Sequence, residues 1–220
     1  MISGPWHFQR AVRDATVRVT ASPDPLAGLR RVGVVNPNPH VVLVAGPPAS
    51  GKSTTGAALA KSLGAALLDQ DRLTNPLMDV LTELVGAREY SDPAVASIAR
   101  DARYECVFRA VEDSARAGVS AVAVAPFTRE CRDPEAWRAL EARLAMLNTP
   151  VRLVWIALDR EEVGRRMRGR AAARDAEKLV ELDAYLAGVE LSVPVGPHVV
   201  VDGRTSAEEQ VASLRTALDL

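Results

Sequence analysis

Short apolar runs alternate with segments of helical periodicity from residue 40 to the end of the chain. Strands that are buried on both faces read as continuous apolar runs, whereas half-exposed strands alternate between apolar and polar residues. The continuous runs therefore predict an α/β fold, with a parallel sheet covered by helices on both faces. Five core strands are expected, at His40–Ala45, Ala65–Asp69, Val119–Ala125, Val151–Leu158 and Val199–Val201.

Start and stop signals place helices between these strands. A helix from about Ser53 to Leu63 should end at Gly64, because glycine accepts the left-handed conformation that closes a helix. A capping residue followed by proline predicts a helix start, and so does a capping box. These signals lie at Asn75-Pro76, Asp92-Pro93, Asp133-Pro134, Asp159 with Glu162, and Ser206 with Glu209.

Apolar residues recur at helical spacing in the segment that should begin at Asn75 and end at Gly86. Such a stripe is typical of a helix that packs one face on a core. The residues of the stripe are Leu77, Val80, Leu81 and Leu84.

The first 39 residues have a different pattern. Two proline-rich patches, Ser22–Pro25 and Asn36–Pro39, flank short apolar pieces. Clusters of this kind favour loops over long regular elements. We interpret residues 1–39 as an extension packed on the core and residues 40–220 as the main domain.

Composition narrows the class of protein. A chain of 220 residues, 48% of them hydrophobic, fits one domain with a sizeable core. The formal net charge of −1 provides no basic field to gather nucleic acid, so no nucleic-acid partner is expected. No apolar run reaches the roughly 18 residues of a membrane helix, and no signal-peptide stretch opens the chain. We therefore expect no membrane association and a cytoplasmic location, and leave the oligomeric state open.

The strongest motif is a phosphate-binding loop. Residues 46–54 read Gly-Pro-Pro-Ala-Ser-Gly-Lys-Ser-Thr and fit GxxxxGK[ST], with an apolar strand before them and a helical segment after them. The glycines let main-chain amides turn inward at a helix N-terminus, where phosphates bind. Lys52 should span the β and γ phosphates, and the Ser53 hydroxyl should ligate Mg²⁺. We expect ATP and Mg²⁺ as cofactors, with nucleotide contacts from Gly46, Ala49, Ser50, Gly51, Lys52, Ser53 and Thr54.

Together with three further segments, this loop resembles that of the small, AAA_33-like P-loop kinases related to shikimate and gluconate kinases, chloramphenicol phosphotransferase and zeta-type toxins. The resemblance covers about residues 40–220. It implies a three-layer P-loop fold with strand order 2-3-1-4-5 and an arginine-rich lid at about residues 159–175. It also implies an ATP-dependent kinase that phosphorylates a hydroxyl of a small-molecule acceptor. The three segments are Asp69-Gln70-Asp71, Pro126 to Glu130, and the arginine cluster between Arg165 and Arg174.

The acidic pair after the second strand is the first candidate for chemistry. The resemblance implies that one carboxylate holds metal-bound water and the other contacts the acceptor hydroxyl. A carboxylate within hydrogen-bond reach can orient an attacking hydroxyl and accept its proton. Asp71 is the candidate base, Asp69 is a candidate metal ligand beside Ser53, and both are candidates for substrate contact. Helix capping or turn formation is the alternative role for both aspartates.

Five arginines lie on and after the helix that should begin near Asp159. Phosphoryl transfer spreads negative charge over oxygen atoms, and guanidinium groups on a closing lid can neutralise it. A solvated arginine face is the alternative for part of the cluster. The resemblance favours Arg166 and Arg170 as catalytic residues, and Arg166 and Arg174 as nucleotide contacts.

Candidates for acceptor binding lie on two other segments. Arg129 follows the third strand, whose carboxyl end should open onto the ligand crevice. It can grip an acidic or polar acceptor or pair with Glu130 on the surface. By family analogy, Arg103 and Tyr104 face the acceptor pocket from the long helix, although such residues on a helix surface are usually just solvated.

One departure from many P-loop proteins concerns the third strand. It ends in Val122-Ala123-Val124-Ala125 and lacks the aspartate that helps to order Mg²⁺ through water. The metal site must therefore depend on Ser53 and on the pair of Asp69 and Asp71. Two other functions fit the same motifs: a nucleotide-dependent switch or ATPase, and a zeta-type toxin kinase acting on a nucleotide sugar. The sequence does not identify the acceptor.

Overall fold

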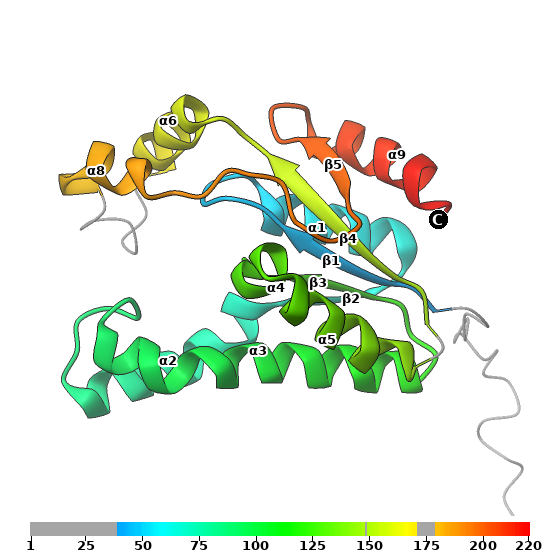
Figure 1. Cartoon of the computed structure of the whole chain (residues 1–220), viewed down its shortest axis with the longest axis horizontal. Helices are drawn as coiled ribbons and strands as arrows, with labels where there is room; N and C mark the ends of the chain where they lie inside the picture. Colours follow the sequence, from blue (N-terminus) through cyan, green and yellow to red (C-terminus); the bar gives the residue numbers. More distant parts are fainter. Residues whose placement is uncertain (1–38, 148, 171–178) are drawn as a thin grey trace, which may run out of the picture. The chain divides into compact units, whose positions relative to one another are not determined.

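A computed structural model describes residues 39–147, 149–170 and 179–220 (Figure 1). The predicted N-terminal extension, residues 1–39, lies outside the described residues except for its last residue. Arg174 and the end of the predicted lid lie outside them as well.

The five predicted strands form one parallel sheet. The order along the sheet is β2-β3-β1-β4-β5, which confirms the expected 2-3-1-4-5 arrangement. In register, Val44 of the central strand lies between Val124 and Val154 of its two neighbours. The strands are β1 (Val41–Ala45), β2 (Ala66–Asp69), β3 (Ala121–Val124), β4 (Val151–Ala157) and β5 (Val199–Asp202).

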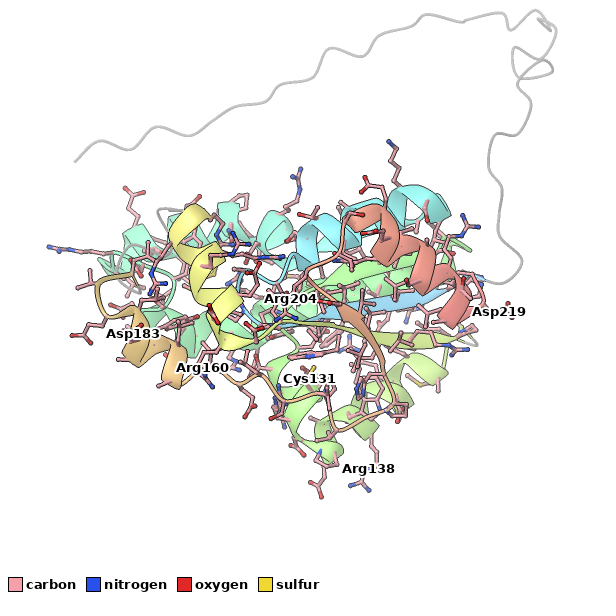
Figure 2. The ribbon with its side chains drawn as sticks, turned by 90° about the horizontal axis from the view of Figure 1, so that it is seen from above. Cys131, Arg138, Arg160, Asp183, Arg204 and Asp219 are labelled. Carbon is pink, nitrogen blue, oxygen red and sulfur yellow. The ribbon has the colours of Figure 1, made fainter. Side chains whose placement is uncertain are left out.

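Alternate residues of the central strand pack in opposite layers. Leu43 belongs to a core with α3 (Pro93–Arg116), α4 (Thr128–Arg132) and α5 (Pro134–Ala145). Val44 belongs to a second core with α1 (Lys52–Leu63) and α9 (Ala207–Leu218). Figure 2 shows both layers: Arg138 marks α5 on one side of the sheet, and Asp219 marks the end of α9 on the other. The three-layer architecture is therefore as predicted.

Helix α2 (Gln70–Val85) begins six residues earlier than the Asn75-Pro76 signal indicated. Asp69 caps it instead: its Oδ1 accepts hydrogen bonds from the backbone N–H groups of Asp71 and Arg72, at 3.0 and 3.3 Å. Pro76 consequently lies inside the helix and not at its start. The predicted boundary was wrong because Asp69, at the end of β2, already caps the helix before Asn75 is reached, and Pro76 is accommodated inside it.

The apolar stripe predicted for this helix is mostly exposed, and of its four residues only Leu81 packs against a core. Leu77 and Leu84 are 70% and 79% exposed, whereas Thr74 and Thr82 are buried. Each of these threonine hydroxyls donates a 2.7 Å hydrogen bond to the carbonyl four residues earlier in its own helix. Because their hydroxyls are hydrogen-bonded within the helix, these threonines can occupy the side that packs against α3. The periodicity of apolar residues alone cannot reveal such a polar packed side.

Two helices after β4 form a separate small core. The side chains of α6 (Arg160–Arg170) and α8 (Leu182–Ala187) pack together through Met167 and Leu186, with Leu158 beneath them. Within the described ranges, no helix is long and apolar enough to cross a membrane.

An ion-pair network joins α3 to α5. Arg143 donates to Glu105 at 2.7 and 3.2 Å and also binds Glu112, while its guanidinium lies 5.3 Å from the centre of the Phe108 ring. Arg109 adds a 2.7 Å bond to Glu105. Hydrogen bonds from Arg143 and then from Arg109 lower the pKa of Glu105 from 4.5 to about 2. The network stabilises the pairing of the two helices mainly while this carboxylate is ionised.

We expect Glu105→Gln to lower the free energy of unfolding at pH 7 by about 1 kcal/mol, since partial exposure screens the pairs. Because folding depresses the pKa, the contribution of Glu105 is complete above about pH 4.5 and disappears as the pH falls toward 2. Denaturant titrations of both proteins should therefore converge in acid. Glu141→Gln, on the exposed face of α5, should change stability little at any pH. A difference between Glu105→Gln and the parent that grows in acid would contradict this account.

A close approach between α1 and β3 depends on Gly56. A Cβ atom added there would lie 2.4 Å from Cγ2 of Val124. We expect Gly56→Ala to destabilise the fold by about 1–3 kcal/mol, the usual cost of overpacking. The matched change Gly169→Ala, where an added Cβ meets nothing within 4 Å, should stabilise helix α6 by about 0.5–1 kcal/mol. Thermal unfolding of the two variants checks the contrast, and equal midpoints would refute it.

Candidate functional site

The loop between β1 and α1 has a backbone shape that few side chains permit. Gly46 has φ +153°, Ala49 has φ +57° and Gly51 has φ +96°. A Cβ on Gly46 would lie 2.7 Å from the carbonyl oxygen of Ile156 and 2.8 Å from Oγ of Ser50. Gly51 is also the N-cap of α1, and no side chain caps this helix end. The first amides of α1 therefore point toward the loop, as anion binding at a helix N-terminus requires.

Polar groups along this loop are positioned for an anionic ligand. Nζ of Lys52 donates to the carbonyl oxygens of Gly46 and Pro47, at 2.9 and 2.7 Å, so it folds back across the loop. Ser50 is 1% exposed, and its hydroxyl has no hydrogen-bond partner among the described residues. A buried hydroxyl of this kind needs a partner, and phosphate oxygens are suitable acceptors for it and for the Lys52 ammonium.

A cavity of about 1050 Å³ opens beside the loop. Its other walls come from the end of β2, the first half of α2, the loop between α2 and α3, the end of β3, α6 and α8. The residues of these walls include Asp69, Gln70, Asp71, Asn75, Asp79, Arg88, Glu89, Tyr90, Ser91, Val124, Pro126, Arg166, Arg170 and Tyr185. This single space joins the predicted phosphate contacts to both predicted aspartates.

The two aspartates occupy different environments. Asp69 is buried and caps α2 through Oδ1, the alternative role considered from the sequence. The Asp71 side chain is 48% exposed, and its Oδ1 accepts a 2.7 Å hydrogen bond from Nη2 of Arg103. Arg103 of α3 also donates to Thr74 at 2.8 Å and to Asn75 at 3.0 Å, so one guanidinium bonds to three residues of α2 and fixes the Asp71 carboxylate. The structure thus brings together Asp71 and Arg103, two residues that the sequence placed on separate segments.

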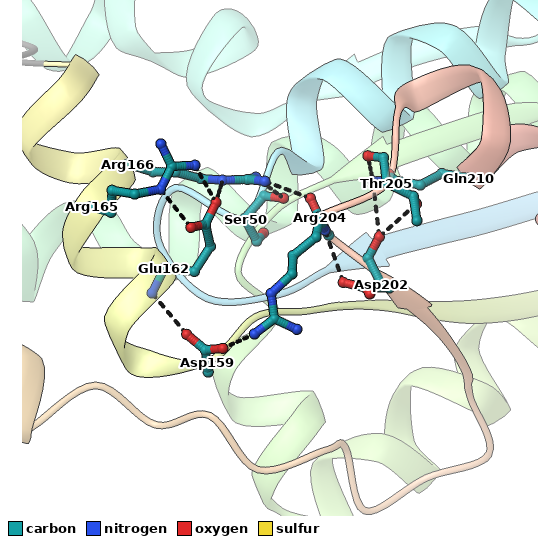
Figure 3. Close-up of polar contacts among 10 residues, drawn as sticks. Ser50, Asp159, Glu162, Arg165, Arg166, Asp202, Arg204, Thr205 and Gln210 are labelled. Atoms are coloured by element: carbon teal, nitrogen blue, oxygen red, sulfur yellow. Dashed lines mark hydrogen bonds and ion pairs between the residues drawn. The ribbon is translucent and has the colours of Figure 1, made fainter.

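Arg166 connects three parts of the molecule around the phosphate-binding loop (Figure 3). It donates to Glu162 at 2.6 Å, to the Ser50 carbonyl at 3.4 Å and to the Gly203 carbonyl at 2.8 Å. Arg170 lines the same cavity one turn later. Arg165 shares Glu162 but does not line the cavity. Hydrogen bonds from Arg165 and then from Arg166 lower the pKa of Glu162 from 4.5 to about 2, so this carboxylate stays charged and anchors both arginines.

The turn after β5 is fastened on two sides. Arg204 forms an ion pair with Asp159 at the start of α6. Gln210 of α9 is buried and donates to the carbonyl oxygens of Asp202 and Thr205, at 3.2 and 2.9 Å, while its own carbonyl oxygen accepts from Thr55 of α1. These contacts fix the turn beside the phosphate-binding loop, within reach of Arg166.

A family model described as an AAA domain matches residues 41–191, which is more than half of the chain. The chain belongs to this AAA domain family. No curated protein matches the chain.

Solved structures share the fold of this AAA domain at low sequence identity. An APS kinase of Mycobacterium tuberculosis, in complex with AMPPNP and APS, is 17% identical with a TM-score of 0.58, over 84% of this chain and 99% of that one. A gluconokinase of Sinorhizobium meliloti 1021 is 19% identical with a TM-score of 0.53, over 82% and 92%. A sugar kinase of Janibacter sp. HTCC2649 is 22% identical with a TM-score of 0.51, over 83% and 95%.

Three residues predicted to bind the acceptor, Arg103, Arg129 and Tyr104, do not line the cavity of this AAA domain, and Arg103 reaches it only through its bond to Asp71. Arg129 is exposed on the short helix α4. Tyr104 packs against Phe108 and Phe127, at ring distances of 6.2 and 6.1 Å, and burial raises the pKa of its hydroxyl. Their acceptor contacts stay predictions, whereas the observed role of Tyr104 is packing.

Several cavity residues were not found from the sequence. Asp79, Glu89 and Tyr90 lie on α2 and in the α2–α3 loop, and the Tyr90 hydroxyl bonds to the Asp79 carboxylate. Proximity of residues 79 and 90 depends on how α2 packs against α3, which no local pattern encodes. Gln70 lay within the quoted Asp-Gln-Asp motif, but its type suggested no chemistry.

The donor groups at the loop fit a magnesium nucleotide. Mg²⁺ usually keeps several waters and binds one or two protein oxygens together with phosphate oxygens. Ser53 is exposed in the cavity, and Asp69, at the end of β2, lines the same cavity. No group of three or more His, Cys, Asp or Glu residues that could hold a metal by itself occurs in the described part of the chain. A site shared between Ser53, a carboxylate and nucleotide phosphates is compatible with these residues.

We expect Arg166→Lys to weaken binding of ADP with Mg²⁺ about tenfold, because lysine keeps the charge but cannot reach Glu162 and both carbonyls at once. The matched variant Arg165→Lys loses only a pair to Glu162 and should bind ADP within about twofold of the parent. Titration calorimetry compares the two, and equal effects would show that the bridge made by Arg166 is unimportant.

Proposed function

We propose that this AAA domain transfers the γ-phosphate of ATP to a hydroxyl of a small-molecule acceptor. The observation that supports this most is the single cavity of about 1050 Å³ that joins the phosphate-binding loop to the exposed side of Asp71. Donor and acceptor could then react side by side in one space, as direct transfer requires.

The nucleotide end of the cavity provides groups that match phosphate oxygens. Inward-facing amides of the loop and of the first turn of α1 would bind the anionic tail, and Lys52 would exchange its bonds to the Gly46 and Pro47 carbonyls for phosphate. Ser53, with Asp69 as the second candidate, would hold Mg²⁺. When bound, the metal withdraws charge from phosphate oxygens and aligns them.

The acceptor end provides a carboxylate for the attacking hydroxyl. An alcohol that attacks phosphorus must lose its proton, and a fixed carboxylate can orient the oxygen and take that proton late in the reaction. Asp71 fits this role because its side chain is about half exposed in the cavity while Arg103 fixes its position. Arg103 acts here as a positioning residue.

Charge that develops on the transferred group needs stabilisation from the opposite wall. Arg166 and Arg170 lie on this wall, one helical turn apart. Guanidinium groups placed before the reaction cost little reorganisation, and one such group can contribute several kcal/mol in a water-poor site. Arg174, on the predicted lid, is a further candidate for contact with the nucleotide.

We expect Lys52→Ala to abolish tight ATP binding and phosphoryl transfer, since it removes the ammonium that faces the loop. Lys61→Ala, on the exposed face of the same helix, should retain both. The measurement is a screen of hydroxyl compounds with ATP and Mg²⁺, in which mass spectrometry detects the gain of a phosphoryl group.

We expect Asp71→Asn to lower kcat by about 10²–10⁴ while ATP affinity changes by less than about threefold, because the carboxylate acts on the acceptor. The kinase would be refuted, and a nucleotide-dependent ATPase favoured, if ATP hydrolysis were slow, no compound accelerated it and Asp71→Asn left its rate unchanged.

A further inference from the structure

The charges that line the cavity are divided between its two ends. Lys52, Arg166 and Arg170 lie at the nucleotide end. At the other end, which we call the acceptor end, three carboxylates face two guanidinium groups. The carboxylates belong to Asp71, Asp79 and Glu89, and the guanidinium groups belong to Arg88 in the lining and Arg103 behind Asp71. The nearby carboxylate of Asp69 is the candidate Mg²⁺ ligand. Among the described residues, one negative charge therefore remains in excess where an acceptor would bind.

Hydrogen bonds at the acceptor end do not remove this excess. The Asp79 carboxylate accepts from the Tyr90 hydroxyl, and Glu89 accepts from the Ser91 hydroxyl at 3.0 Å. Both donors are neutral, so each bond orients a carboxylate without compensating its charge. An ionised carboxylate can accept about four hydrogen bonds, which leaves capacity for a ligand.

A buried amide at the same end lacks a hydrogen-bond partner among the described residues. Gln70 is 6% exposed and lines the cavity, and its Nε2 makes no hydrogen bond with any described residue. An unsatisfied buried donor costs about 1–3 kcal/mol, so its retention here points to a ligand oxygen that it can bind. This observation is independent of the carboxylates.

We propose that the acceptor end selects a polyhydroxylated compound that carries an ammonium group, and disfavours carboxylate or phosphate compounds. The carboxylates of Asp79 and Glu89 attract the ammonium group, and Nε2 of Gln70 donates to a hydroxyl oxygen. The inference rests on the proposed function only in naming this compound as the phosphoryl acceptor. Clefts lined by one sign of charge concentrate ligands of the opposite sign.

Three sugars that differ only at C6 test the selection by binding alone: 6-amino-6-deoxyglucose, glucose and glucuronate. Each is titrated into the whole chain saturated with ADP and Mg²⁺, with binding followed by NMR or calorimetry. We expect the amino sugar to bind at least about tenfold more tightly than glucuronate, with glucose between them. In about 1 M salt, where the Debye length falls to about 3 Å, the ratio should approach one.

Variants assign the selection to named residues. Asp79→Asn with Glu89→Gln should reduce the ratio to within about threefold, whereas Glu141→Gln with Glu208→Gln removes two charges outside the cavity lining and should preserve it. Gln70→Met should raise the melting temperature of the free protein, because it removes an unpaired buried amide. The same change should weaken all three sugars alike, by about threefold to tenfold.

The inference would be overturned if glucuronate bound as tightly as the amino sugar or more tightly, or if the three sugars showed no charge preference. It would also be overturned if the affinity ratio of the amino sugar to glucuronate survived the changes at Asp79 and Glu89. Because the readout is binding, it is independent of phosphoryl transfer. Failure of every compound in the transfer screen would instead overturn the proposed kinase.

Discussion

The turn of the main chain between β1 and α1 is the constraint on which the rest of the site depends. Gly46 brings the backbone against the Ile156 carbonyl of β4, and Gly51 in the left-handed region starts α1 with its amides directed at the loop. Lys52 then lies across the Gly46 and Pro47 carbonyls. A concave set of donors results, and its charge and shape suit a chain of phosphate groups.

Elements that are distant in the sequence hold this turn in place. Arg166 of α6 bonds to the Ser50 carbonyl and to Gly203 after β5, and Gln210 of α9 joins that same turn to Thr55 of α1. On the opposite wall, Asp69 ends β2 and starts α2, which fixes where Asp71 enters the cavity. The site is thus an outcome of sheet order, because β1, β3 and β2 end side by side around one space.

Much of this arrangement could be predicted from the sequence because it depends on local signals. Apolar runs identified the five strands, the motif identified the loop, and the family resemblance supplied the strand order. Helix α2 shows the limit: Asp69 overrides the Asn75-Pro76 signal, and threonines replace the leucine stripe on its packed side. The acceptor end required tertiary contacts, since Asp79 meets Tyr90 only through the pairing of α2 with α3. Gln70 became a candidate only because its side-chain amide is buried and its Nε2 has no hydrogen-bond partner in the described part of the chain.

Titration calorimetry of the whole chain with ATP and Mg²⁺ tests the central claim, that residues 46–54 bind the phosphates of a nucleotide. The account predicts one saturable site with measurable heat for ATP and for ADP, and at least about tenfold weaker binding of adenosine, because phosphate contacts provide most of the affinity. No heat at millimolar ATP, or equal binding of adenosine and ATP, would contradict it.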